Sequence, residues 1–287
     1  MSMHRVAVIG AGTMGNGIAH VCALGGLEVT LVDADAGAID RAVATIGGNL
    51  ARQVAKGRIT APQRAEALAR VVPGQLEDVA RADLVIEAVP EIAQLKYEIF
   101  AQVDRLAPER TILASNTSSI SITAIAACTD RPGKVIGMHF MNPVPIMQLV
   151  EVIRGLRTAD ATTKSVMDLS RALGKTPVEV RDFPGFVSNR ILAPMINEAV
   201  FALMEGVAEA EAIDAVMKLG MNHPMGPLAL ADLIGLDTCL NILEVLHREL
   251  GDDRYRPCPL LRQYVAAGWL GRKTGRGFHR YEETPEC

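Results

Sequence analysis

The segment 135–152 carries the residue types that an acid–base site needs. It reads as an apolar strand ending near His139, a turn that contains Asn142, and a second apolar strand that holds Glu151. A histidine can exchange a proton near neutral pH, because its ordinary pKa is about 6.5. A carboxylate on the next strand could fix the tautomer of the ring. A lone histidine is more often structural, so the rest of the chain must decide between the two interpretations.

A second candidate site lies at the N-terminus, where a β-branched strand over residues 4–9 runs directly into a Gly-x-Gly-x-x-Gly turn. A helical stretch and a second strand follow, and that strand ends at Asp33. This order is typical of dinucleotide-binding folds, although a glycine-rich turn can also occur without a ligand. The helix N-terminus would attract phosphates, and Asp33 would bind both ribose hydroxyls and repel a 2′-phosphate, which favours NAD over NADP. The expected NAD contacts within the turn are Gly10, Ala11, Gly12, Thr13, Met14 and Gly15.

The order of the elements predicts an α/β fold with a Rossmann-type, doubly wound, mostly parallel sheet. Further strands are expected at 83–88, 111–114 and 176–180. Residues 36–70 interrupt the alternation and read as a helical hairpin, with one helix from about Ala38 to Lys56 and another after Thr60, a plausible N-cap. The hairpin has a basic end, which charge alone would assign to a solvated surface; its cations are Arg52, Lys56 and Arg58.

The polar segment 115–119 follows a predicted strand directly. A doubly wound sheet places its ligands beyond the carboxyl ends of its strands, so this segment is a candidate ligand site. Its serines and threonine could equally cap the helix expected over 120–127. Different residues of the five could serve each purpose.

Beyond a turn at 182–185 the pattern changes to helices only. We therefore expect an NAD-binding domain over 1–184 and an all-α domain over 185–287 for substrate binding and dimerisation. Its short helices present more apolar surface than one small domain buries, which favours a homodimer. The expected helices cover 186–205, with Pro194 producing a kink, then 209–219, 228–234, 236–250 and 259–267, before a basic, glycine-rich segment at 270–278.

Composition excludes several classes of protein. A net charge of −4 gives no general attraction to nucleic acid or to an anionic membrane. No apolar stretch reaches the ~18 to 20 residues of a membrane span, and no signal-peptide apolar region precedes the first strand. The five cysteines form no CxxC pair, so we expect reduced thiols, a cytoplasmic location and no metal site. Motifs of serine hydrolases and of Walker-type nucleotide sites are absent from the sequence.

Seven segments in one consistent order resemble the L-3-hydroxyacyl-CoA dehydrogenase family. They span almost the whole chain and lie at residues 10–15, 85–91, 115–119, 139–145, 184–190, 223–227 and 271–278. The resemblance implies reversible, NAD-dependent oxidation of an (S)-3-hydroxyacyl-CoA to the 3-ketoacyl-CoA. The expected substrate is a short one such as 3-hydroxybutyryl-CoA.

The resemblance also assigns roles to individual residues. It implies that His139 is the general base, that Glu151 orients it, and that Ser118 and Asn189 hold the substrate. Ser118 is implied to contact the cofactor and the coenzyme A thioester as well. The helical hairpin becomes the expected coenzyme A site, with Lys56 and Arg52 as contacts. The further NAD contacts implied are Glu91, Lys96, Asn142 and Lys273.

Two alternatives remain open from the sequence. One is a dehydrogenase of a free hydroxy acid, similar to an L-gulonate 3-dehydrogenase, which shares the same catalytic residue types. The other is a non-catalytic, NAD-binding structural protein, as some lens crystallins are; the complete catalytic set argues against it. Four positions depart from the family pattern and leave the acyl-CoA contacts open, namely Ala51, Pro90, Ile92 and Gln148.

Overall fold

The computed structural model describes residues 3–281, and the chain divides into two compact units between Phe183 and Pro184. The first unit is built on one eight-stranded sheet, in the order β3-β2-β1-β4-β5-β6-β7-β8. Every neighbouring pair is parallel except β6 and β7, which run antiparallel. The predicted doubly wound, mostly parallel sheet is therefore confirmed.

The strands in the middle of the sheet are buried along their whole length, as parallel strands covered on both faces must be. The strand bounds are β1 Arg5–Ile9, β2 Glu28–Val32, β3 Val71–Gly74, β4 Leu84–Glu87, β5 Ile112–Ser115, β6 Val135–Phe140, β7 Leu149–Arg154 and β8 Thr176–Arg181. Sequence analysis missed β3, because this short edge strand contains Pro73 and ends at a glycine, and both residues weaken a strand pattern.

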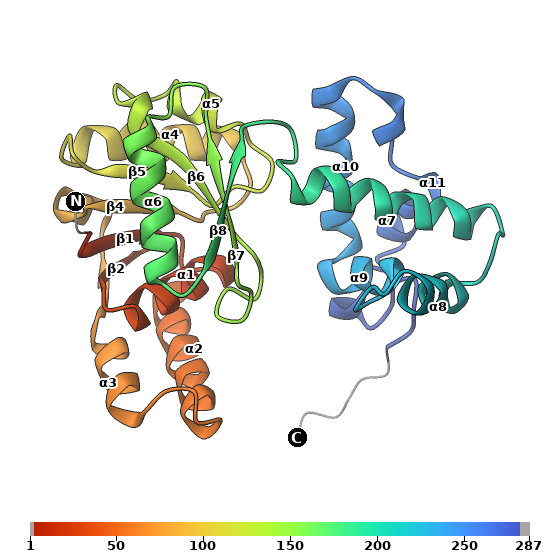
Figure 1. Ribbon diagram of the computed structural model, residues 1–287, viewed down its shortest axis with the longest axis horizontal. Helices are drawn as coiled ribbons and strands as arrows, with labels where there is room; N and C mark the ends of the chain where they lie inside the picture. The colour runs from red at the N-terminus through yellow and green to blue at the C-terminus, as the bar shows by residue number, and fades with distance from the viewer. Residues whose placement is uncertain (1–2, 282–287) are drawn as a thin grey trace. The chain divides into compact units, whose positions relative to one another are not determined.

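The helices of this unit cover the sheet, and two of them form the predicted hairpin. In Figure 1, α2 and α3 run side by side in orange and project away from the sheet. Helix α2 continues through two glycines, because four buried apolar residues at helical spacing hold it against the core. Thr60 caps α3 in a capping box, as expected. The bounds are α1 Thr13–Leu24, α2 Ala36–Ala55, α3 Ala61–Ala69, α4 Ala93–Leu106, α5 Ile122–Ala126 and α6 Asp160–Ala172, with short 3₁₀ turns at Leu76–Arg81 and Pro132–Lys134.

The regular elements of the second unit are helices, apart from isolated β-bridges within 271–280, which confirms the predicted all-α part. Its helices pack around their own apolar core, to which α7, α9, α10 and α11 all contribute. Pro194 lies inside α7. The bounds are α7 Ser188–Met204, α8 Ala210–Gly220, α9 Pro227–Ile234, α10 Leu236–Leu250 and α11 Pro259–Ala266, with 3₁₀ turns at Asp253–Tyr255 and Arg272–Thr274. Among residues 3–281, no helix has the length and apolar character needed to cross a membrane.

Candidate active site

His139 and Glu151 meet because of the register of one strand pair. Strand β6 runs antiparallel to β7 and places the two residues directly opposite each other. Side chains at such positions share one face of the sheet, with their Cβ atoms roughly 5 Å apart. The Nδ1 atom of His139 lies 2.8 Å from Oε2 of Glu151, and the two residues are 6% and 2% exposed. A buried carboxylate therefore orients the ring, as an oriented base requires.

The other ring nitrogen of His139 faces a serine. Ser118 lies in the loop after β5, and its Oγ is 3.1 Å from Nε2 of His139. When Nδ1–H donates a hydrogen bond to Glu151, Nε2 carries the lone pair and can accept a proton. This geometry permits two chemistries, with Ser118 either as a nucleophile or as a partner for a substrate oxygen. The absence of the serine-hydrolase motif from the sequence argues against the first.

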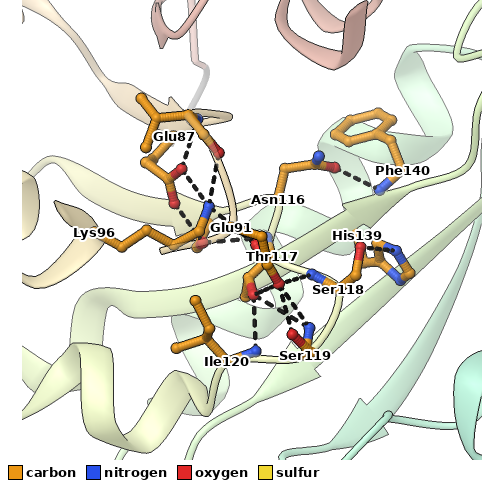
Figure 2. A network of polar contacts seen from close by, with 12 residues as sticks. Glu87, Glu91, Lys96, Asn116, Thr117, Ser118, Ser119, Ile120, His139 and Phe140 are labelled. Carbon is orange, nitrogen blue, oxygen red and sulfur yellow. Dashed lines mark hydrogen bonds and ion pairs between the residues drawn. The ribbon is translucent and has the colours of Figure 1, made fainter. Parts of the chain in front are cut away.

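A single carboxylate oxygen shapes the loop that carries Ser118. Oε1 of Glu91 accepts hydrogen bonds from Thr117 Oγ1 at 2.6 Å, from the amides of Ser118 and Ser119 at 2.9 Å each, and from Ser119 Oγ at 2.9 Å. Burial opposes ionisation of Glu91, but the nearby charge of Lys96 and these hydrogen bonds outweigh it, so its pKa lies below the ordinary value. Glu91 therefore acts as an ionised clamp on the loop (Figure 2).

The polar cluster 115–119 mainly organises this site. The cap of α5 is Ser121, whose hydroxyl accepts from the amide of Ala124, and not a residue of the cluster. Asn116 instead accepts from the amide of Phe140 in β6, which ties the loop to the strand that carries His139. The expectation that one of the five residues caps the helix is thus corrected, because the helix starts two residues later than predicted.

The glycine turn fits a dinucleotide. A Cβ on Gly15 would lie 1.6 Å from the carbonyl oxygen of Gly10, and Gly10 itself has a φ of +103°, so both positions require glycine for the chain's own packing. Around Gly12, by contrast, a Cβ would meet no atom within 4 Å, and Gly12 caps α1 without a side-chain hydrogen bond. This open helix N-terminus suits an approaching phosphate. The Asp33 carboxylate accepts from the amide of Ala11 at 2.7 Å and so holds the turn in place.

The other predicted cofactor residues lie in different surroundings. Lys96 is 1% exposed, and its ammonium is held by two carboxylates, so its contact with a cofactor stays a prediction. Asn142 is exposed in the turn after β6. Asn189 and Lys273 belong to the second unit. Asn189 lies in the first turn of α7, and the ammonium of Lys273 donates to both carboxylate oxygens of Asp237. Their assigned roles also stay predictions.

The basic end of the hairpin borders the turn between β6 and β7. Arg52 and Lys56 line a cavity of about 140 Å³ together with Pro143 and Pro145 from that turn. Sequence analysis proposed no ligand contact at two further lining residues, Asn49 and Arg58, because nothing in the sequence shows that this helix end lies beside the turn. The lining contains cationic and neutral side chains and no carboxylate. The hairpin therefore offers a positive site close to the segment that carries His139.

In the described part of the chain, no three His, Cys, Asp or Glu side chains lie close enough together to hold a metal ion.

Glu87 lies near the site, and sequence analysis assigned it no role. It is buried at the end of β4 and contacts Lys96 and Ser115. Its sequence signals were an acid at the end of an apolar strand and its place within the family segment 85–91.

Comparison with known proteins settles the family. The model of the NAD-binding domain of 3-hydroxyacyl-CoA dehydrogenase matches residues 5–183, and the model of the C-terminal domain of the same enzyme matches residues 185–281. The chain belongs to the 3-hydroxyacyl-CoA dehydrogenase family. It is accordingly an NAD-dependent dehydrogenase, and the serine next to His139 is not a hydrolase nucleophile.

Relatives across the whole length support this membership. The chain is 58% identical to the probable 3-hydroxybutyryl-CoA dehydrogenase of Bacillus subtilis, with 99% of both chains covered. It is 54% identical to the crystal structure of (S)-3-hydroxybutyryl-CoA dehydrogenase from Ralstonia eutropha, with a TM-score of 0.95 and coverage of 98% of this chain and 100% of that one. It is also 42% identical to the 3-hydroxyadipyl-CoA dehydrogenase of Escherichia coli, covering 100% of this chain and 61% of the relative.

Proposed function

We propose that this protein oxidises (S)-3-hydroxyacyl-CoA thioesters to 3-ketoacyl-CoA, reversibly, and that its preferred substrate is the short 3-hydroxybutyryl-CoA. The observation that carries this proposal is the aligned set of Ser118, His139 and Glu151, at 3.1 Å and 2.8 Å, in one unit with a glycine turn that fits NAD. Relatives 52–58% identical that are named for 3-hydroxybutyryl-CoA support the short acyl chain.

In the proposed reaction His139 takes the proton of the substrate's 3-hydroxyl at Nε2. The turn 10–15 would hold NAD, which would supply the acceptor for the hydride of C3. Ser118 donates a hydrogen bond to the same substrate oxygen, and Glu151 stabilises the imidazolium that forms. A general base accelerates a reaction roughly 10²- to 10⁴-fold, and this is the contribution expected of His139.

The same assignment covers the remaining predicted contacts. Asn189 is proposed to hold the substrate, on the family resemblance alone. Asp33 is proposed to bind the ribose of NAD and to disfavour NADP by its charge. The proposed cofactor contacts that complete the set are Glu91, Lys96, Ser118, Asn142 and Lys273.

Coenzyme A recognition is proposed at the basic end of the hairpin. The lining of the small cavity there includes three cationic side chains, and the cavity also borders the turn that follows His139. Phosphates bind cationic side chains through charge-assisted hydrogen bonds. Arg52 and Lys56, both exposed, are thus suited to the phosphates of the nucleotide part of coenzyme A. This site favours a thioester over a free hydroxy acid.

We further propose a homodimer that buries part of the second unit, in a cytoplasmic protein. Several large apolar side chains of this unit are exposed, and burying such side chains contributes about 25 cal/mol per Å². The four cysteines that the structure describes are free thiols, which fits a reducing compartment. The apolar residues proposed for the interface are Ile191, Val207, Val216, Leu219, Met221 and Leu233.

A substrate panel tests the proposal. NADH oxidation would be followed with acetoacetyl-CoA, with longer 3-ketoacyl-CoA thioesters, with the 3-ketoadipyl thioester and with free keto acids. We expect the highest kcat/KM with acetoacetyl-CoA. Turnover restricted to free acids would favour the gulonate-type alternative, and NADH binding without any turnover would favour a non-catalytic protein.

A further inference from the structure

Glu87 is a buried carboxylate that the proposed chemistry does not use. It ends β4, is 1% exposed, and pairs in register with Ile9 on one side and Ser115 on the other. Its Oε1 accepts from Lys96 Nζ at 2.6 Å and from the Val89 amide at 2.8 Å, and its Oε2 accepts from Ser115 Oγ at 2.6 Å. A buried ion pair stabilises a fold little more than apolar residues of similar size would. Stability alone therefore does not account for Glu87.

Lys96 connects Glu87 to the clamp on the serine loop. Its ammonium contacts Glu87 and also lies 3.3 Å from Oε2 of Glu91, while it donates to the carbonyl of Val89 at 3.2 Å. One oxygen of Glu91 thus faces Lys96, and the other gathers four donors from Thr117, Ser118 and Ser119. The position of Lys96, set by Glu87, therefore sets the position of Glu91 (Figure 2).

A second connection runs through the sheet. Ser115 Oγ donates to Glu87 and accepts from the amide of Thr117 at 3.2 Å. The carbonyl of Glu87 accepts from the amide of Asn116 at 2.8 Å. Both connections reach the backbone beside Ser118, whose hydroxyl lies 3.1 Å from His139. Since a displacement of about 1 Å at a reacting geometry can cost ~10² in rate, this backbone must be held firmly.

We propose that Glu87 is a positioning residue for the Ser118 hydroxyl and acts through Lys96 and Ser115. This inference rests on the proposed role of Ser118 in turnover. The carboxylate of Glu87 accepts from Lys96, from Ser115 and from the Val89 amide, and both of its side-chain partners lead to the loop that carries Ser118. Removing its charge should consequently slow turnover while Ser118 is present and should matter little once Ser118 has been replaced.

A double-mutant cycle tests this coupling. The kcat for NADH formation from 3-hydroxybutyryl-CoA would be measured for wild type, Glu87→Gln, Ser118→Ala and the double variant. We expect Glu87→Gln to lower kcat about tenfold in the wild-type background and less than twofold in the Ser118→Ala background. The KM for NAD should change less than kcat. Equal losses in both backgrounds, or a kcat within twofold of wild type, would overturn the proposal.

Two further variants separate positioning from folding. Asp104→Asn alters another buried ion pair on α4, with Arg131, and should leave kcat unchanged. If Glu87→Gln does not fold, Ser115→Ala replaces it, because it keeps the ion pair and removes only the hydrogen bonds of the Ser115 hydroxyl. We expect about a threefold fall in kcat from Ser115→Ala, again absent in the Ser118→Ala background. The same fall in both backgrounds would contradict the coupling.

A measurement without substrate distinguishes this inference from the proposed function. If wild type turned over no 3-hydroxyacyl-CoA, the proposed function would fail, and ring ¹⁵N resonances of histidine would then decide the positioning role. Glu87→Gln, or Ser115→Ala in its place, should shift the His139 Nε2 resonance and leave that of His247, in the other unit, in place. An unchanged His139 resonance would rule the positioning role out.

Discussion

The contact between Glu151 and His139 makes the sharpest prediction, through the substitution Glu151→Gln. Glutamine keeps the size of the side chain and an oxygen that can accept from Nδ1 at 2.8 Å, so chiefly the charge is lost. In the proposed reaction that charge faces a forming imidazolium in a site where both residues are buried. A hydrogen bond to a charged group contributes about 1.5–3 kcal/mol, which corresponds to a ~10- to ~150-fold fall in kcat.

The assay is the saturated rate of NADH formation from 3-hydroxybutyryl-CoA, with NADH affinity measured separately by fluorescence. NADH affinity should stay within twofold of wild type, because the proposed role of Glu151 is to orient His139 and not to bind the cofactor. The matched control is Glu179→Gln in the neighbouring strand β8, where a half-exposed carboxylate pairs with Arg154. A Glu151→Gln variant with the kcat of this control would refute the orienting role.

Three other outcomes follow from the geometry. The double variant Arg52→Ala/Lys56→Ala should raise the KM for the acyl-CoA about tenfold in initial-rate kinetics and leave the KM for NAD unchanged. The control Arg64→Ala, on the exposed side of α3, should change neither KM. Gly15→Ala should disrupt the turn and abolish NADH binding. Gly12→Ala adds a Cβ that meets no protein atom within 4 Å, so it should weaken NADH binding without lowering the unfolding temperature. Fluorescence titration measures the binding, and thermal melts measure the stability. Burial, and then the charge of Lys175, lower the pKa of His20 to about 4. The unfolded chain protonates at its ordinary pKa of about 6.5, so the folded state should lose about 2 kcal/mol of stability between pH 7 and 5, and His20→Gln should abolish that loss in urea titrations.

The local pattern of residue types along the chain was enough to predict most of the helices and strands. The buried strands are short apolar runs, and a helix was expected after the glycine turn because the order strand, Gly-x-Gly-x-x-Gly, helix is typical of dinucleotide-binding folds. Thr60 and Gln63 mark the start of α3 by a capping box that is readable from four residues. Errors arose where local signals were weak, as in edge strand β3, or where several polar residues before a helix could cap it, as before α5.

The amino-acid sequence by itself determined which side chains are available and on which strands they lie. His139, Glu151 and Ser118 could all be named from residue type and from motifs in order along the chain. The distances between these side chains could not be predicted. Apolar alternation indicates which face of a strand is buried, but it does not say which strands become neighbours or in what register. The pairing of β6 with β7 places His139 opposite Glu151, and the order of β4, β5 and β6 brings Ser118 to the same ring.

Tertiary structure alone also decided the surroundings of the charged residues. Glu87, Glu91 and Lys96 are separated along the chain by a strand end and a helix start, and a sequence reading expected Lys96 at a cofactor. The fold buries Lys96 between two carboxylates, and its contact with a cofactor stays a prediction. Since buried charges must be paired, and pairing partners are chosen by position in space, this network exists only once the sheet and α4 have packed together.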